Sequence, residues 1–469
     1  MSASLAPAGL SAPALNPRTR MLLEGAIVPT LLRLAWPNIL IMLIQASTGL
    51  IETWWVSRLG TDALAGMALV FPVFMMMQML SGGAMGGGIA SAIARSLGAG
   101  RQDSANALVM HAILINFALG VMFAVLVIGF GRPLYAALGG EGGSLEAALL
   151  YSNVVFAGTP LVWLMNAFAS VIRGTGNMML PSLAISIGVF LLVPLSPVLI
   201  YGLGPIPGLG IAGAGIAVIF TTALTALMLG WYLVSGRGVV RPARTRLRWS
   251  YFADILRVGA VGSLSTLQTT LTVMLTTALV GAAAGPDAIA GYGTGGRLEY
   301  LLVPLVFGLG APLVALVGTN IGAGNRQRAL RIALTGGAVA FILTEAIGSA
   351  AAFWPYAWLG LFGNDPRMLE TGAAYLRVVG PAYGFFGLGL SLYFASQGAG
   401  RLLWPLVAGG LRLVVAVGGG WFALRVFGSL DWVFAALALA LVLYGTMLAT
   451  AIWSGVWFRK AAAPTVARI

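Results

Sequence analysis

The sequence contains no cysteine, one histidine and few charged residues, and each shortage excludes a class of protein. The absence of cysteine excludes disulfides and thiolate metal sites. The single histidine, His111, has no carboxylate or cysteine partner at metal-ligand spacing, so we expect a satisfied interfacial residue and no metal site. Charged residues make up 8% of the chain, too few for the surface of a soluble protein. No catalytic residues are predicted, because an enzyme would need a clustered nucleophile, base or metal; an intramembrane transferase is the remote alternative.

What the chain has in abundance is apolar sequence. Of its 469 residues, 59% are hydrophobic, and the mean hydropathy is +0.95. The chain also contains 65 glycines, which in lipid allow helices to approach closely. Long apolar runs with few charges predict an all-α integral membrane protein with many spans.

Twelve apolar stretches are long enough to cross a bilayer at roughly 20 residues each. Their predicted limits are 31–56, 64–92, 105–130, 146–172, 180–202, 210–234, 253–280, 288–318, 330–354, 368–395, 402–426 and 432–457. This pattern predicts an N-lobe of six spans at 31–235, a basic linker at 236–251 and a C-lobe of six spans at 252–458. Tails are expected at 1–30 and 459–469.

The two halves resemble one another. Three motifs of the first half return about 224 residues later, at the same places between apolar runs. The pairs are Asp62–Gly66 with Asp287–Gly291, Leu97–Gly100 with Ile321–Gly324, and Arg173–Gly176 with Gln397–Gly400. Six spans per half give the two repeats the same orientation, so an axis along the membrane normal relates them. A duplicated helical bundle is the usual architecture of a carrier with its site near the repeats.

The basic residues predict the orientation. With the N-terminus in the cytoplasm, the inner loops and tails carry 18 of them and the outer loops carry four, namely Arg58, Arg132, Arg367 and Arg425. This asymmetry places both termini inside. The net charge of +13 is therefore explained by membrane orientation and not by nucleic acid. The cluster from Arg237 to Arg248 is expected to lie along the inner leaflet and contact membrane lipids.

Glu52, in the first span, is the strongest candidate for a coupling residue. An ionisable side chain in a span is costly and suggests a function. Gln45 lies two turns below Glu52 on the same face and Thr48 one turn below, while Pro37 offers a bending point. A carboxyl group in a poorly solvated cavity can exchange a proton near neutral pH. The alternative is a structural Glu held by Arg58 or by neighbouring amides.

Four further charged residues lie in the second half of the chain. Glu299 is deep in the eighth span, and it is either a second cation or proton site or part of a structural network. Such a buried ionic network would join it to three residues in the ninth, tenth and eleventh spans, namely Glu345, Arg377 and Arg412.

Several motifs together resemble the multidrug and toxic compound extrusion (MATE) transporters over almost the whole chain. They are Pro37, Gln45 and Glu52 followed by Arg58–Ala65, then Leu97–Gly100, Arg173–Asn177 with Pro181, Pro205–Ala214, and Arg297–Glu299. The resemblance implies a V-shaped, two-lobed exporter with twelve helices. It implies expulsion of amphipathic, often cationic, compounds in exchange for H⁺ or Na⁺, with no cofactor beyond that ion.

The resemblance also assigns the site. In the family an acid, usually Asp, stands at the position of Glu52, and its protonation or cation binding bends the first helix at the proline. One branch of the family adds an Asn and an Asp in the fifth span, where this chain has Leu192 and Ser196. The absence of a second carboxylate here favours H⁺ over Na⁺, because a hard cation requires several oxygens.

The expected substrate cavity and cellular context complete the prediction. Five polar side chains are candidates for the cavity wall: Gln45, Thr48, Ser196, Gln268 and Thr269. The chain is expected to act as a monomer in a bacterial inner membrane on small amphipathic molecules. A lipid-linked oligosaccharide or lipid flippase of the same superfamily is the alternative, and its phosphate-bearing cargo would require a more cationic cavity.

Overall fold

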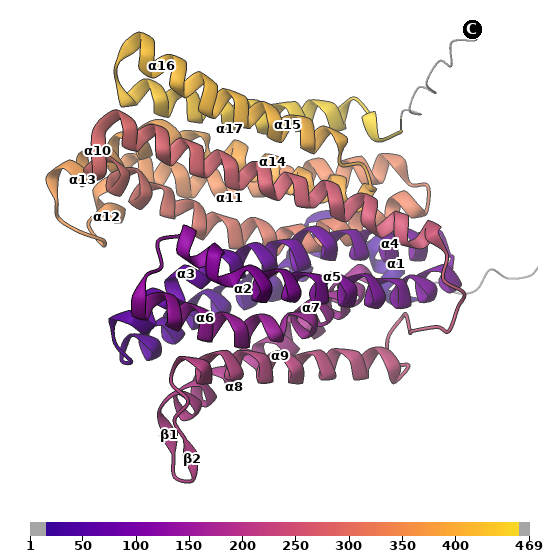
Figure 1. Ribbon diagram of the computed structural model, residues 1–469. Coiled ribbons are helices and arrows are strands. Elements are labelled where there is room, and N and C mark those ends of the chain that lie inside the picture. The colour runs from indigo at the N-terminus through magenta and orange to yellow at the C-terminus, as the bar shows by residue number, and fades with distance from the viewer. Residues whose placement is uncertain (1–15, 459–469) are drawn as a thin grey trace, which may run out of the picture.

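A computed structural model describes residues 16–458 and shows an all-helical membrane protein apart from one short hairpin in this range (Figure 1). By length and composition eleven helices can cross a membrane, and a bent helix pair supplies a twelfth span. The N-lobe contains α2 (Ile27–Ser57), α3 (Thr61–Gln78), η1 (Met79–Met85), α4 (Gly86–Gly98), α5 (Gln102–Ala137), α6 (Gly142–Ala157), α7 (Thr159–Gly174), α8 (Met179–Tyr201) and α9 (Ile211–Val234). Strands β1 (Gly202–Leu203) and β2 (Ile206–Pro207) form the antiparallel hairpin between α8 and α9.

The C-lobe begins with α10 (Trp249–Gly322), which contains two spans separated at Gly285. Gly285 has φ 80° and ψ −169°, a conformation essentially restricted to glycine, and it turns the chain between the spans. The remaining elements are α11 (Arg326–Phe353), α12 (Pro355–Leu359), α13 (Pro366–Val379), η2 (Gly380–Ala382), α14 (Tyr383–Ala399), α15 (Leu403–Leu413), η3 (Val414–Gly419), α16 (Gly420–Phe427), α17 (Leu430–Trp453) and η4 (Val456–Phe458).

The fourth and tenth spans are interrupted at corresponding places. Helices α6 and α7 meet at a 46° bend after Gly158, with Pro160 in the first turn of α7. In the C-lobe, the 3₁₀ turn η2 contains Pro381 and joins α13 to α14. A proline cannot donate the backbone hydrogen bond that continues a helix, and in both of these spans one stands at or next to the break, Pro160 in the fourth and Pro381 in the tenth. The shared break supports the two-lobe repeat.

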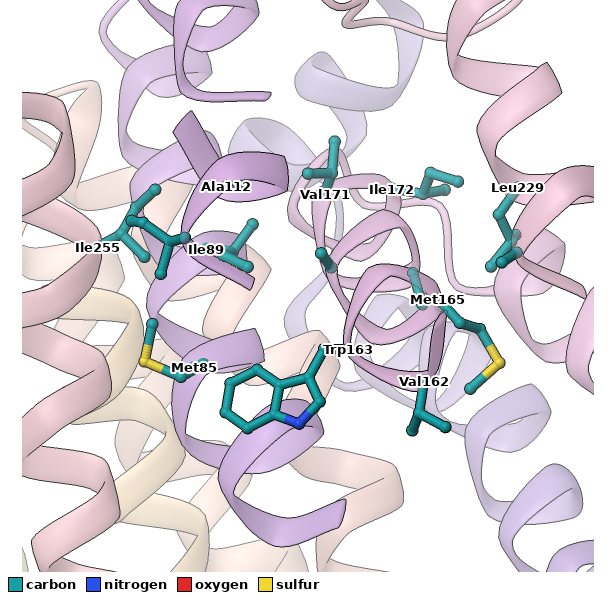
Figure 2. Close-up of a cluster of buried hydrophobic side chains, with 14 of the residues drawn as sticks. Met85, Ile89, Ala112, Val162, Trp163, Met165, Val171, Ile172, Leu229 and Ile255 are labelled. Carbon is teal, nitrogen blue, oxygen red and sulfur yellow. The ribbon is translucent and has the colours of Figure 1, made fainter. Parts of the chain in front are cut away.

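Each lobe has a packed apolar core, and the N-lobe core extends to the seam between the lobes. Trp163 and Met165 of α7 are both buried in it; Trp163 lies on the side of α7 that faces Met85 and Ile89 of the second span, whereas Met165 lies on the opposite side, toward Leu229 (Figure 2). Ile255 of α10 closes the same cluster from the C-lobe. The two lobes therefore share apolar surface at this level of the membrane.

The two lobes contact each other at one end of the bundle, the end at which α1 (Pro17–Glu24) lies. Gly98 of α4 lies against the Thr319 carbonyl of α10, and Gly322 of α10 lies against the Arg95 carbonyl. Neither position leaves room for a Cβ atom, so glycine sets the distance between the lobes. This packing forms the closed end of the V.

The start of the chain differs from the tail predicted at 1–30. Asn16 accepts a hydrogen bond from the Arg18 amide (3.0 Å) and caps α1, whose Leu22 is buried. Asn320 of α10 donates to the Leu22 carbonyl at 3.0 Å, so α1 is fixed to the C-lobe. The first span also begins earlier, at Ile27. The predicted stretches 1–15 and 459–469 lie outside the described residues.

The basic linker between α9 and α10 lies against the start of α5 until α10 begins at Trp249. Gln102 donates to the Val239 carbonyl (2.6 Å), and the Arg241 amide donates to Asn106 (3.0 Å). Farther along, the Arg248 amide donates to the ring of His111, which is fully buried. His111 is thus a hydrogen-bonded residue, as expected, although it is buried beneath the linker.

Candidate functional site

Glu52 lies in α2 with its side chain directed at α8. The residue is 5% exposed, and Ser196 donates a hydrogen bond to one carboxylate oxygen at 2.7 Å. The other oxygen, Oε1, is buried and has no hydrogen-bond partner among the described residues. A buried carboxylate that accepts one hydrogen bond from a neutral donor, and whose second oxygen accepts none, has little to stabilise its negative charge.

The surroundings of Glu52 exclude the structural reading in which Arg58 neutralises it. The Arg58 guanidinium lies 3.9 Å from the centre of the Trp54 ring, and it forms no ion pair with Glu52. Thr48 is buried one turn below Glu52, but its hydroxyl donates to the Ile44 carbonyl at 2.8 Å. The carboxyl group is therefore left to Ser196.

Two other predicted residues of the first span occupy different settings. Pro37 is buried inside α2, where it removes one backbone hydrogen bond without ending the helix. Gln45 is exposed. The structure brings Glu52, Thr48 and Ser196 together and leaves Gln45 outside this group.

A polar cluster that was not predicted lies beside η1 in the N-lobe. Asn166 of α7 donates to the Gln78 side chain (3.1 Å) and to the Ser81 hydroxyl (2.8 Å). The turn η1 is a π-helix, a feature that often marks functional sites. The sequence signal that could have indicated this cluster is the side-chain amide of Asn166, which stands in the middle of an apolar span.

Glu299 lines a hollow of about 380 Å³ inside the C-lobe. Tyr375 donates to its carboxylate at 3.1 Å, and the hydroxyls of Tyr375 and Tyr383 are 3.0 Å apart. Arg412 and Tyr292 line the same hollow. None of the ion pairs among the described residues joins Glu299 to Arg412.

A second hollow of about 300 Å³ adjoins the first at Arg412. Gln268 and Thr269 line it, together with the aromatic residues Tyr393 and Tyr444. Gln268 donates to the Leu406 carbonyl at 3.3 Å, while its own side-chain oxygen is buried without a partner. These two predicted cavity residues thus lie in the C-lobe, separate from the Glu52 group.

The predicted ionic network of four residues is wrong. Glu345 accepts hydrogen bonds from Ser349 (3.0 Å) and from the Gly384 amide (2.8 Å). Because α14 begins at Tyr383, its free N–H groups and positive dipole end serve the carboxylate in place of an arginine. Arg377 is exposed and lies 5.6 Å from the ring of Tyr356. Only Glu299 and Arg412 of the four share a cavity.

The seam between the lobes contains an ion pair that the sequence did not reveal. Arg95 of α4 contacts Asp254 of α10 at 2.7 Å, with the arginine side chain 15% exposed. Beside it, Ser91 donates to the Gln397 carbonyl at 2.6 Å. Both interactions join the N-lobe to the C-lobe at the closed end of the V.

The arrangement suits ion exchange better than metal binding. In the part of the chain that the structure describes, no group of three or more His, Cys, Asp or Glu side chains could hold a metal ion. Glu52 can take up and release a proton, with Ser196 as the donor that stabilises its charged form. Pro37 lies between this carboxyl group and the closed end of the V.

Comparisons with known proteins agree with this architecture. The sequence model of the MatE family matches residues 37–198 and 263–422. A relative described as an FAD transporter, from Shewanella oneidensis, is 30% identical over 400 residues, covering 84% of this chain and 87% of its own. The probable multidrug resistance protein NorM of Thermotoga maritima is 24% identical over 389 residues, covering 80% of this chain and 81% of its own.

Solved structures show the same fold. A MOP superfamily transporter from Pyrococcus furiosus superimposes with a TM-score of 0.86 at 24% identity, covering 94% of this chain and 98% of that chain. An outward-facing multidrug resistance MATE family transporter gives a TM-score of 0.85 at 24% identity, with the same coverage. The family match spans both lobes and includes Glu52, Ser196, Glu299 and Arg412. The chain therefore belongs to the MATE family of multi-pass membrane transporters and is not an enzyme.

Proposed function

We propose that this protein is a secondary active antiporter that exports amphipathic organic compounds in exchange for protons. The observation that carries the proposal is the Glu52 carboxyl group, buried in α2 with one neutral donor and one unbonded oxygen. Such a group changes its hydration and partners when it gains or loses a proton. Pro37 in the same helix is the point at which α2 would bend in response.

Protons suit this site better than sodium. A hard cation prefers several oxygen ligands, and the described contacts of Glu52 provide its own carboxylate and the Ser196 hydroxyl. Leu192, one turn before Ser196 on α8, offers no oxygen from its side chain. The coupling ion is accordingly expected to be H⁺.

The cargo is expected to include cationic compounds, because a cation and a proton compete for the same negative carboxyl group. The relatives named for multidrug resistance and multidrug export support a broad range of cargo. The Shewanella relative named as an FAD transporter adds a flavin nucleotide to the compounds worth testing. A phosphate-bearing cargo, whether a lipid or a flavin nucleotide, is disfavoured at Glu52 itself, because the negative charge would repel it.

We place the protein in a bacterial inner membrane with both termini in the cytoplasm. The asymmetry of basic residues supports this orientation. In that orientation the lobes are packed together on the cytoplasmic side, and alternating access requires them to part there and close on the outer side.

The test is transport by the purified full-length protein in liposomes with independently imposed H⁺ and Na⁺ gradients. Ethidium, a permanent cation, should accumulate in an acidic lumen, and a sodium gradient should change little. Ethidium uptake that needs sodium and ignores pH would overturn the assignment of the coupling ion. No uptake under either gradient would overturn the proposed export of cations.

A further inference from the structure

Arg412 is a positive charge in the middle of a membrane span. It is the tenth residue of α15, about 14 Å from the start of a 25-residue span at 1.5 Å per residue. The π-helix η3 begins two residues later, at Val414. Arg412 is half-buried, and a charge at this depth in a span is costly and marks a functional site by default; π-helices are frequent at such sites.

The guanidinium of Arg412 has no hydrogen-bond acceptor and no ion-pair partner among residues 16–458. Its central carbon lies 5.6 Å from the ring centres of both Phe386 and Tyr444. These aromatic contacts hold its position but leave its N–H donors unused. Glu299 borders the first hollow with Arg412, yet its closest described partner is Tyr375.

The second hollow carries a positive charge, whereas the Glu52 site carries a negative one. Of the described side chains that line the hollow, Arg412 alone is charged. Much of the remaining wall is neutral: it is formed by the polar groups of Gln268 and Thr269 and by the rings of Tyr393 and Tyr444.

We propose that this second hollow binds the carboxylate, sulfonate or phosphate group of an aromatic, amphipathic cargo, with Arg412 as its ion-pair partner. A planar guanidinium binds such groups through two parallel hydrogen bonds. The aromatic part of the cargo packs against Tyr393 and Tyr444, whose rings are amphipathic. The inference rests on the proposed export function and adds an acidic class of cargo in the C-lobe to the cationic class at Glu52.

The experiment measures equilibrium binding of 6-carboxyfluorescein by fluorescence anisotropy, using the full-length protein in nanodiscs of neutral phosphatidylcholine. Wild-type protein should bind the dye, and Arg412→Gln should weaken binding about ten- to hundredfold, the value of lost hydrogen bonds between charged groups. Ethidium uptake driven by pH should be unchanged. Arg377→Gln is the matched control, because Arg377 borders neither hollow, and it should bind both dyes normally.

Arg412→Lys provides a second variant if the neutral substitution does not fold. Lysine keeps the charge but loses the planar fork, so binding should weaken severalfold without disappearing. Equal carboxyfluorescein affinity in the wild type and in both variants would overturn the proposal. So would the absence of dye binding by wild-type protein that still takes up ethidium, and in that case the proposed export function stands.

The acidic group could instead come from a lipid, and the nanodisc composition distinguishes the two sources. Anionic phosphatidylglycerol should leave carboxyfluorescein affinity nearly unchanged if the hollow receives soluble cargo. If phosphatidylglycerol abolishes dye binding to the wild type but does not alter the residual binding of Arg412→Gln, which lacks the positive charge, the hollow is a lipid headgroup site. That result would overturn the cargo assignment.

Discussion

Replacing Glu52 by Gln should remove the coupling of transport to the pH gradient while leaving the fold intact. The two side chains have nearly the same shape, and the amide oxygen of Gln can still accept the bond from Ser196. The amide group cannot exchange a proton, however. Of the acids in the N-lobe, Glu52 alone is buried among the described residues, so one proton per cycle is expected there.

The size of the effect follows from that single proton. One pH unit supplies about 1.36 kcal/mol per proton, which supports an accumulation of about tenfold for a monovalent cation exchanged one for one. Such an exchange moves no net charge and is insensitive to voltage. We therefore expect wild-type liposomes to reach about a tenfold ethidium gradient per pH unit, and Glu52→Gln liposomes to reach none.

Two variants serve as controls in the same assay. Glu52→Asp keeps an exchangeable proton and should retain uptake. Thr48→Val alters a buried neighbour whose hydroxyl bonds only to its own helix, and it should leave the plateau unchanged. A normal plateau in Glu52→Gln would refute the role of Glu52. A wild-type plateau of about a hundredfold per pH unit would indicate two protons and would bring Glu299 into the coupling.

Three other substitutions test the structural roles assigned above. Asp254→Asn should cost about 1.5–3 kcal/mol of unfolding free energy, measured by thermal denaturation in detergent, because Arg95 loses its charged partner in the seam. Glu345→Gln should destabilise the protein by about 1 kcal/mol through loss of the charge at the start of α14 near Gly384, with the pH dependence of ethidium uptake unchanged. Gly322→Ala should separate the lobes at their closed end, seen as faster amide hydrogen exchange in α4.

Matched substitutions away from the seam separate these effects from general damage. Arg132→Gln breaks the ion pair between Arg132 and Glu146, in which both side chains are 64% exposed. It should lower the free energy of unfolding by less than about 1 kcal/mol. Gly129→Ala adds a methyl group where no atom lies within 4 Å and should leave exchange in α4 unaltered. Equal losses for Asp254→Asn and Arg132→Gln would contradict the importance of the seam. A change in pH dependence for Glu345→Gln would contradict its structural role.

The twelve spans were predictable because each needs about 20 apolar residues, and such runs are visible in any single sequence. Ser196 was predicted only as a candidate for the cavity wall, at a fifth-span position that completes the site in one branch of the family, and the structure shows its hydroxyl donating to Glu52. The attention to that position came from family resemblance, because hydropathy alone does not show which faces of two helices meet.

The errors concern partners that sequence patterns cannot specify. Glu345 was expected to need an arginine, whereas a backbone N–H at the start of α14 satisfies it. Arg95 and Asp254 are 159 residues apart, and only the packing of the lobes brings them together. Helix α1 was missed because it is short and polar, and its stability comes from docking against α10 rather than from its own periodicity.

Helices α4 and α10 approach closely enough that an engineered disulfide between them could stop the conformational cycle. A Cβ atom placed at Gly318 would lie 2.9 Å from that of Ala94 on the other lobe, slightly less than the separation of about 3.5–4.5 Å found in disulfides. Since the native chain has no cysteine, the double substitution Ala94→Cys and Gly318→Cys would introduce one reversible cross-link and no competing thiols. Oxidation would then arrest the rocking of the lobes in a single state, and a reductant would restart it.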